Sequence, residues 1–263
     1  MAPTTSSPAA PAAAPTSDDV VAIPLRHPGR WISAALLLLV LAMFARSLWS
    51  NENVDHPTIA EFVFDPRILR GVLYTIGITV VSMVIGTILA VALAVMRMSA
   101  NPVLRTLAFG YVWFFRGTPL LVQIIFWGYL GLLYQQIQLG LPLTDITFFS
   151  ADTNTLIPAL VGGVIALSLN EGAYAAEIVR AGLLAIDQGQ REAAYSLGMG
   201  PGYTLRRIVL PQAMKVIIPP MGNETISMLK NTSLLMVVSV AELYTAASQI
   251  SSQNLRQVEL LVV

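Results

Sequence analysis

The chain has 263 residues, of which 55% are hydrophobic and 11% are charged, and its mean hydropathy is +0.68. A soluble domain carries about 25% charged residues, so this chain has too few charges to cover a water-facing surface, and we expect a membrane protein. The formal net charge of zero gives no sign of a nucleic-acid-binding protein, which is normally basic. With no cysteine and only two histidines, disulfides, iron–sulfur clusters and thiolate or histidine metal centres are excluded, and we predict no metal site.

The N-terminal part divides into a polar tail and an apolar run. Residues 1–25 are rich in Ala, Pro, Ser and Thr and show no apolar periodicity, which predicts a disordered tail. Residues 26–50 combine a positive flank with an apolar stretch, a pattern shared by signal peptides and first transmembrane helices. We favour an uncleaved transmembrane helix, because the leading segment is long and no small-x-small cleavage site follows.

Two further segments predict membrane spans. Gly71–Met96 contains no charged residue and exceeds the roughly 20 apolar residues that a helix needs to cross a bilayer. A later span is expected from Leu156 to about Ile178, after a polar loop over Gln138–Thr155.

The apolar region between these two spans requires a break. One continuous helix would place Arg116 in the middle of the membrane, whereas proline is favoured in the first turn of a helix and disfavoured in its interior. Residues 117–119, which read Gly-Thr-Pro, therefore predict two pieces. The first is an interfacial helix over Val103–Arg116, anchored by Arg116, and the second is a span over Pro119–Gln136.

The C-terminal part is apolar from Ile208 to Leu229, with prolines at 211, 219 and 220. Proline disfavours a helix interior, so we expect interruptions there. The sequence leaves the path of residues 230–257 open. Residues 258–263 resemble the opening of a helix, so we expect the sequence as given to lack a last span and tail.

Lys and Arg mark the cytoplasmic side of a membrane protein. Residues 50–66 and 135–157 contain acidic residues and no Lys or Arg, whereas basic residues precede the first span and gather in and beside residues 179–205. This alternation predicts a multi-pass protein whose N-terminus and 179–205 loop are cytoplasmic.

A spaced motif lies in this cytoplasmic loop. A Glu-Ala-Ala triplet is followed after three residues by a glycine and, nine residues later, by Ile-x-Leu-Pro. The spacing resembles the signature E-A-A-x3-G-x9-I-x-L-P of the membrane permeases of type I ABC importers, and every fixed position matches. The matching residues are Glu192, Ala193, Ala194, Gly198, Ile208, Leu210 and Pro211.

The resemblance narrows to the polar amino-acid uptake subfamily through residues 115–123, 170–174, 177–182 and 229–234, and it runs from about Gly71 to the C-terminus. It implies an all-α membrane protein with a MetI-like five-helix core over residues 68–263. The helix at 26–50 would be an addition to this core. The loop over 183–211 would hold a short coupling helix that docks onto an ATPase subunit.

For function, the resemblance implies the permease subunit of an ATP-driven importer of polar amino acids in the bacterial cell membrane. Two permease subunits, identical or paralogous, would form the substrate pathway in the lipid bilayer. Two cytoplasmic ATPase subunits would bind ATP and Mg²⁺, and an extracytoplasmic binding protein would deliver the substrate. We expect no cofactor and no catalytic residue in this chain, because neither Lys215 nor Lys230 follows the Gly-x4-Gly of a phosphate-binding loop.

Ionisable residues inside a span are costly and are therefore candidates for a substrate pathway. A carboxylate suits the ammonium group of an amino acid, and an amide or backbone donor suits its carboxylate. The candidates are Asn170, Glu171, Asn223, Glu224 and Lys230. A structural alternative stays open, in which Glu224 pairs with Lys230 or Lys215 and Glu171 bonds across a permease dimer interface.

Two other functions also stay open at this point. An ion-coupled secondary transporter uses broken helices and buried carboxylates as well, but it would leave the spaced motif unexplained and would need an inverted repeat that the sequence does not display. A membrane scaffold without a transport pathway would have no need of charged residues inside spans. The sequence selects neither one amino acid as substrate nor a homodimer over a heterodimer.

Overall fold

The computed structural model describes residues 28–51, 54–140 and 147–262. The tail predicted to be disordered, residues 1–25, lies outside these ranges. The chain divides into two compact units, residues 1–54 and 55–263, and each is described by itself.

In the first unit, α1 (Pro28–Trp49) exposes apolar side chains around its whole circumference. A helix that is apolar on all sides suits a uniformly apolar surrounding. Residues 29–49 are long and apolar enough to cross a membrane. The transmembrane helix at 26–50 stays a prediction, and the length and composition of α1 support it.

The second unit is built around α3 (Pro66–Arg97). Local chemistry fixes where this helix begins: Pro66 takes the first helical position, and the Asp65 carboxylate accepts a hydrogen bond of 2.7 Å from the Arg67 amide. The helix is 32 residues long and confirms the span predicted at Gly71–Met96.

The helix α8 (Ala159–Leu184) packs mainly against α3 and also contacts the elements before and after it. Small residues let helix backbones approach closely inside a membrane. The buried small side chains of α8 are Gly162, Gly163, Ala166, Ser168, Gly172, Ala173, Ala175, Ala176 and Gly182. The helix confirms the later span, predicted up to about Ile178, and continues beyond it to Leu184.

The break predicted at residues 117–119 is present. There α4 (Pro102–Gly117) ends and α5 (Leu120–Gly128) begins, at an angle of 98° to it. The span predicted over Pro119–Gln136 is wrong, because α5 has only nine residues and the chain enters a β-strand at Gln136 after the short α6 (Leu130–Leu133).

Two antiparallel strands occupy parts of the polar loop predicted over Gln138–Thr155. Strand β1 (Gln136–Gly140) pairs with β2 (Thr147–Asp152), and Gln136 lies opposite Asp152. The short α7 (Thr153–Leu156) then leads into α8. Strand β1 alternates polar and apolar residues over only four positions, and β2 does not alternate, so the pattern was too short to predict the pair.

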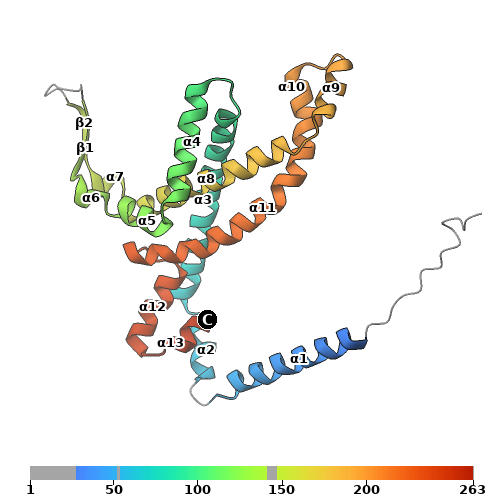
Figure 1. Cartoon of the computed structure of the whole chain (residues 1–263). Helices are drawn as coiled ribbons and strands as arrows, with labels where there is room; N and C mark the ends of the chain where they lie inside the picture. The colour runs from blue at the N-terminus through green and yellow to red at the C-terminus, as the bar shows by residue number, and fades with distance from the viewer. Residues whose placement is uncertain (1–27, 52–53, 141–146, 263) are drawn as a thin grey trace, which may run out of the picture. The chain divides into compact units, whose positions relative to one another are not determined.

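The interfacial position predicted for Val103–Arg116 is also contradicted. Figure 1 shows α4 alongside α3. Ala108 and Val112 of α4 are buried in one cluster with Ala90 of α3 and Ala175 of α8. Because α4 packs along two candidate membrane spans, α3 and α8, we group it with these helices and not with interfacial helices.

After α8 the chain forms a second series of helices. These are α9 (Gln188–Ser196), α10 (Pro201–Thr204), a π-helical turn (Leu205–Val209), α11 (Leu210–Asn231), a 3-10 helix (Thr232–Val238), α12 (Leu243–Asn254) and α13 (Gln257–Val262). The prolines at 219 and 220 do not interrupt α11, which continues across them. The long run ending at Val238 is bent by 51° relative to α12.

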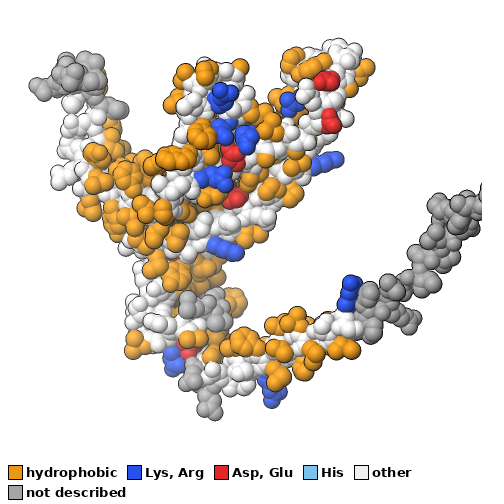
Figure 2. All heavy atoms as spheres, in the orientation of Figure 1, with side chains coloured by type: hydrophobic (Ala, Val, Ile, Leu, Met, Phe, Trp, Pro, Cys, Tyr) orange, Lys and Arg blue, Asp and Glu red, His pale blue; other side chains and the backbone are white. Residues whose placement is uncertain are grey.

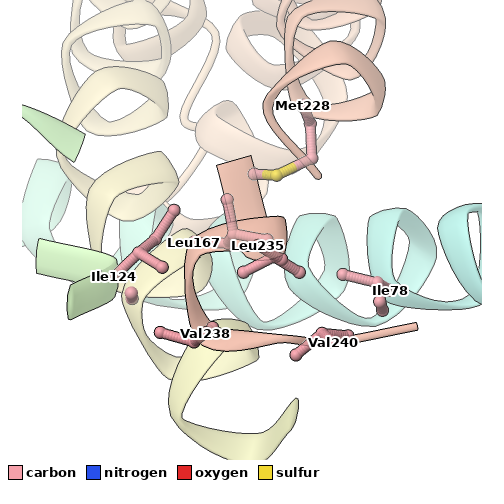
Figure 3. Packing of buried hydrophobic residues seen from close by; sticks show 8 residues of the cluster. Ile78, Ile124, Leu167, Met228, Leu235, Val238 and Val240 are labelled. Atoms are coloured by element: carbon pink, nitrogen blue, oxygen red, sulfur yellow. The ribbon is translucent and has the colours of Figure 1, made fainter. Parts of the chain in front are cut away.

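One apolar cluster ties these elements together. In Figure 3, Ile78 of α3, Leu167 of α8 and Leu235 of the 3-10 helix lie in the same cluster. Ile124 of α5 and Met228 of α11 complete its walls. Packing in this cluster therefore holds α5, which follows the α4–α5 break, and α11 against α3 and α8.

In the described part of the chain, three helices are long and apolar enough to cross a membrane, or up to five spans if each of two bent helix pairs counts as one. The two strands aside, the regular elements are helices. Together these features confirm the predicted helical membrane fold.

Gly162 sets the contact between α8 and α5. A Cβ atom at residue 162 would lie 2.5 Å from the Trp127 carbonyl oxygen and 3.0 Å from the Gly128 Cα, and neither backbone atom can rotate away. We expect Gly162→Ala to lower the free energy of unfolding by about 1–3 kcal/mol, the usual cost of overpacking, measured by thermal unfolding in detergent. Gly110→Ala is the matched control, because a Cβ there meets no atom within 4 Å; equal melting temperatures for the two variants would contradict this packing.

Candidate functional site

The predicted coupling residues lie on and after α9, and local hydrogen bonds end this helix at Gly198. Gly198 has φ of +78°, a conformation that strains residues with a Cβ atom. Its amide donates to the Tyr195 carbonyl, and the Met199 amide donates to the Ala194 carbonyl. This pair of bonds is the Schellman motif, which ends α9 at Gly198.

The two alanines of the motif lie on different sides of α9. Ala193 is exposed, but Ala194 is only 4% exposed because it packs within this chain, so the two alanines do not form one outer surface. Successive residues of an α-helix point about 100° apart, which separates them. Glu192, Tyr195 and Leu197 are exposed beside Ala193, and Leu197 is 82% exposed. Large apolar side chains directed into solvent are typical of a surface that another protein covers.

The second half of the motif shapes the return from α9 to α11. Ile208 lies in the π-helical turn, and Leu210 and Pro211 open α11. Proline has no amide hydrogen to donate to the preceding turn. The turn before it is wide, so that the Leu210 amide donates to the Leu205 carbonyl.

A cleft of about 670 Å³ opens where the α4–α5 break meets α8 and α11, a size in the range of small-molecule sites. Its polar lining consists of Arg116, Thr118, Asn170, Glu171, Tyr174, Glu224, Ser227 and Asn231. Figure 2 shows Lys/Arg and Asp/Glu side chains gathered beside α4 on a surface that is otherwise mostly hydrophobic. The structure thus brings together three predicted pathway residues that two different helices carry.

Glu171 is the most deeply buried charged residue of the cleft, with 4% of its surface exposed. Gly86 of α3 makes room for it, since a Cβ at residue 86 would lie 2.6 Å from the Glu171 Cγ. Its Oε1 atom is buried and has no hydrogen-bond partner among the described residues. A buried carboxylate oxygen without a partner is costly, which suits a ligand that brings its own donor.

Arg116 is the cationic group of the cleft. Its guanidinium lies 5.0 Å from the centre of the Tyr174 ring, in a cation–π contact. The sequence suggested only an interfacial anchor, which stays a prediction, whereas Arg116 lies at the end of α4 and lines the same cleft as Glu171 and Glu224. Its position directly before the Gly-Thr-Pro break was the sequence signal for this role.

Gln123 holds the break in shape, and sequence reasoning did not single it out. Its side chain is buried, and its Nε2 donates to the Phe115 carbonyl at 3.0 Å, the Thr118 carbonyl at 3.1 Å and the Thr118 Oγ1 at 2.8 Å. Asn170 of α8 adds hydrogen bonds from its Nδ2 to the same Phe115 carbonyl at 3.0 Å and to the Gln123 Oε1 at 3.3 Å. Asn170 therefore braces the wall of the cleft with its amide.

Two of the predicted pathway residues lie elsewhere. Asn223 and Lys230 are exposed on α11 and do not line the cleft. Within the described ranges, neither Lys215 nor Lys230 lies within ion-pair distance of Glu224, so the structure does not support that pairing. Nor do any three His, Asp or Glu side chains of these ranges come together as metal ligands.

The sequence matches a protein family and several curated proteins. The model for "Binding-protein-dependent transport system inner membrane component" matches residues 82–263. The arginine transport system permease protein ArgU of Corynebacterium glutamicum is 47% identical over 245 residues, which are 93% of this chain and 76% of that protein. The L-cystine transport system permease protein TcyB of Bacillus subtilis is 42% identical over 200 residues, 76% of this chain and 77% of that protein.

Solved structures resemble the chain as well. An amino acid ABC transporter crystallised with histidines superposes with a TM-score of 0.66 at 34% identity, over 80% of this chain and 88% of that one. The MetNI methionine ABC transporter in an inward-facing conformation gives a TM-score of 0.57 over 80% and 90%. At 18% identity, the second likeness is one of fold alone.

Replacing Gln123 tests how the cleft wall is held. Gln123→Leu keeps the side chain's approximate size and removes the donor that serves Phe115 and Thr118. We expect the free energy of unfolding to fall by about 1–3 kcal/mol, because the Thr118 carbonyl loses its donor and Asn170 loses the Gln123 acceptor. Gln253→Leu, at an exposed position, is the control for added hydrophobicity. A melting temperature of Gln123→Leu no lower than that of the control would show that the break is held by other contacts.

Proposed function

The chain belongs to the family of binding-protein-dependent transport system inner membrane components, and from this premise we propose how its two sites act in import. It is the permease subunit of an ATP-driven amino-acid importer and not itself an enzyme, as its relatives are transport permeases. These relatives do not favour a secondary transporter or a scaffold. The observation that carries the proposal is that one helix, α8, lines the cleft at its middle and leads into the coupling helix at its end.

The chain would work within a larger complex in the inner membrane. We infer a second permease subunit, identical or paralogous, two cytoplasmic ATPase subunits that bind ATP and Mg²⁺, and an extracytoplasmic binding protein. The placement of Lys and Arg supports a cytoplasmic N-terminus and a cytoplasmic α9. Residues 68–263 would form the permease core, with the helix at 26–50 as an added transmembrane helix.

The coupling surface would be the exposed face of α9. Glu192, Ala193, Tyr195 and Leu197 present a small, partly apolar surface, and the chain offers no other covering for it among the described residues. The hydrogen-bonded turn at Gly198 connects α9 to the helices that lead into α11. An ATPase subunit that binds α9 and moves would therefore displace α8 and α11 together.

The cleft would hold the amino acid on its way through the permease. Arg116 offers hydrogen bonds and charge to the α-carboxylate, because guanidinium groups bind carboxylates in a forked geometry. Glu224, which is half-buried, and the unpartnered Oε1 of Glu171 would accept from ammonium or guanidinium groups. Asn223 and Lys230 stay predicted pathway residues only for a state in which α11 has turned them inward.

The charges of the cleft favour a basic amino acid. Two carboxylates and one guanidinium line it, so after Arg116 and one carboxylate have bound the α-groups, the other carboxylate remains for a cationic side chain. Relatives from Corynebacterium glutamicum and Bacillus subtilis are named for arginine transport. We therefore propose arginine and similar cationic amino acids as the substrate class.

Replacing Glu224 tests the cleft. In proteoliposomes with the cognate ATPase and binding protein, we expect Glu224→Gln to lower uptake of arginine by about tenfold or more at subsaturating substrate, since a lost charged hydrogen bond is worth at least that factor. Glu61→Gln, at an exposed position on α2 (His56–Phe62), removes the same charge elsewhere. Arginine and lysine uptake at the wild-type rate in Glu224→Gln would discard this role.

Replacing Gly198 tests the coupling surface. A β-branched residue is strained by at least about 1–2 kcal/mol in the left-handed conformation, so Gly198→Val should distort the end of α9. We expect normal membrane insertion, ATP hydrolysis that continues, and uptake reduced by about fivefold or more. Gly200→Val is the control, because Gly200 has φ of −70° and no atom within 4 Å of an added Cβ. Unchanged uptake per ATP in Gly198→Val would contradict coupling through α9.

A further inference from the structure

The join between α8 and α9 is short and carries a side-chain bond across it. Only residues 185–187 separate Leu184, at the end of α8, from Gln188, at the start of α9. Across this turn, Arg191 Nη2 of α9 donates to the Leu183 carbonyl of α8 at 3.1 Å. The bond thus connects the coupling helix directly to the last turn of the helix that lines the cleft.

The chemistry of this bond is favourable. The last four carbonyls of an α-helix have no partner in the helix itself, and Leu183 is among the last four residues of α8. A guanidinium supplies a charge-assisted hydrogen bond there and also a positive charge at the negative end of the helix dipole. Arg191 is half-buried, and its buried Nε has no hydrogen-bond partner among the described residues, so its position depends on packing and on the Nη2 bond to Leu183.

α9 also packs against α10 and the π-helical turn, but its other side-chain hydrogen bonds are weaker or local. Asp187 accepts a hydrogen bond from the Gly189 amide within the turn, which begins α9 without joining it to α8. The bond from Gln212 Nε2 of α11 to Gln190 Oε1 is longer, at 3.4 Å, and exposed. Arg191 is therefore the side chain best placed to keep α9 and α8 at a fixed angle.

A fixed angle matters because α8 is the route to the cleft. Glu171 lies 12 residues before Leu183, about 18 Å along a helix at 1.5 Å per residue. Between them α8 is packed against α3 and α11, so the helix moves as one piece. If the turn at 185–187 were free to bend, displacement of α9 would be absorbed there.

We propose that Arg191 is a positioning residue that locks the coupling helix α9 to the C-terminal end of α8, so that displacement of α9 reaches the cleft. The proposal rests on the proposed function, in which α9 receives movement from an ATPase subunit. Arg191 touches neither substrate nor nucleotide. Its effect appears in the number of substrate molecules imported per ATP hydrolysed.

The test uses the complete importer in proteoliposomes. Arg191→Met keeps the apolar stem of the side chain and removes the donors and the charge. We expect bound ATPase subunits and continued ATP hydrolysis, with uptake per ATP reduced about fivefold or more, a coupling factor of ordinary size. Arg191→Lys, which keeps a donor and the charge, should restore part of the ratio. Arg206→Met, at an exposed position in the π-helical turn that contacts α9, should leave the uptake per ATP unchanged.

The outcomes separate this proposal from the proposed function. If Arg191→Met has the wild-type ratio while Gly198→Val lowers it, coupling through α9 stands and the role of Arg191 is overturned. If neither variant changes the ratio, both fail. Loss of the ATPase subunits from the purified Arg191→Met complex would also overturn the proposal, because it would assign the residue to docking.

A second measurement does not depend on how Arg191→Met folds. The chain has no cysteine, so spin labels can be placed on Ala181→Cys of α8 and Ser196→Cys of α9, both at exposed positions. With Arg191 intact, we expect one narrow distance distribution that is the same with and without ATP. A distance that changes with ATP would show that the two helices bend at residues 185–187 and would overturn the lock.

Discussion

The close packing of α8 is the constraint on which the rest of the permease depends. Its small buried residues let α3, α5 and α11 approach its backbone, as at Gly162 beside Trp127 and at Gly182 beside Ile217. Lipid tails are as apolar as the side chains themselves, so helices in a membrane associate through such close contact and not through a hydrophobic driving force. Packing on several sides fixes the orientation of α8, and with it the positions of the charged side chains on this helix.

The two sites of the chain use this support in different ways. At the middle of α8, Gly86 of the neighbouring helix opens the space that Glu171 fills, and Glu171 lines the cleft together with Arg116 and Glu224. At its end, the exposed face of α9 is joined to α8 by a turn of three residues and by Arg191. In the proposed mechanism, an event at either site would reach the other through the unbroken helix between them, which packs against α3 and α11.

Local rules predicted the features that depend on neighbouring residues. The break before Pro119 follows from proline geometry, which acts within a few bonds. The span predicted over Pro119–Gln136 failed for a non-local reason. Its end at Gln136 pairs with Asp152 in the antiparallel strand pair, and the apolar length of a segment cannot predict pairing with a distant residue.

The sequence by itself determined that this chain is a helical membrane protein, that a helix breaks before Pro119, and that it carries the spaced motif, because charge content, proline positions and fixed spacing are properties of the chain alone. Only the tertiary structure decided which residues share the cleft. Arg116, Glu171 and Glu224 come from three helices, and whether each side chain faces lipid or a neighbour depends on how those helices rotate against one another. The same reason buried Ala194 and left Ala193 exposed, a difference that two identical side chains cannot encode.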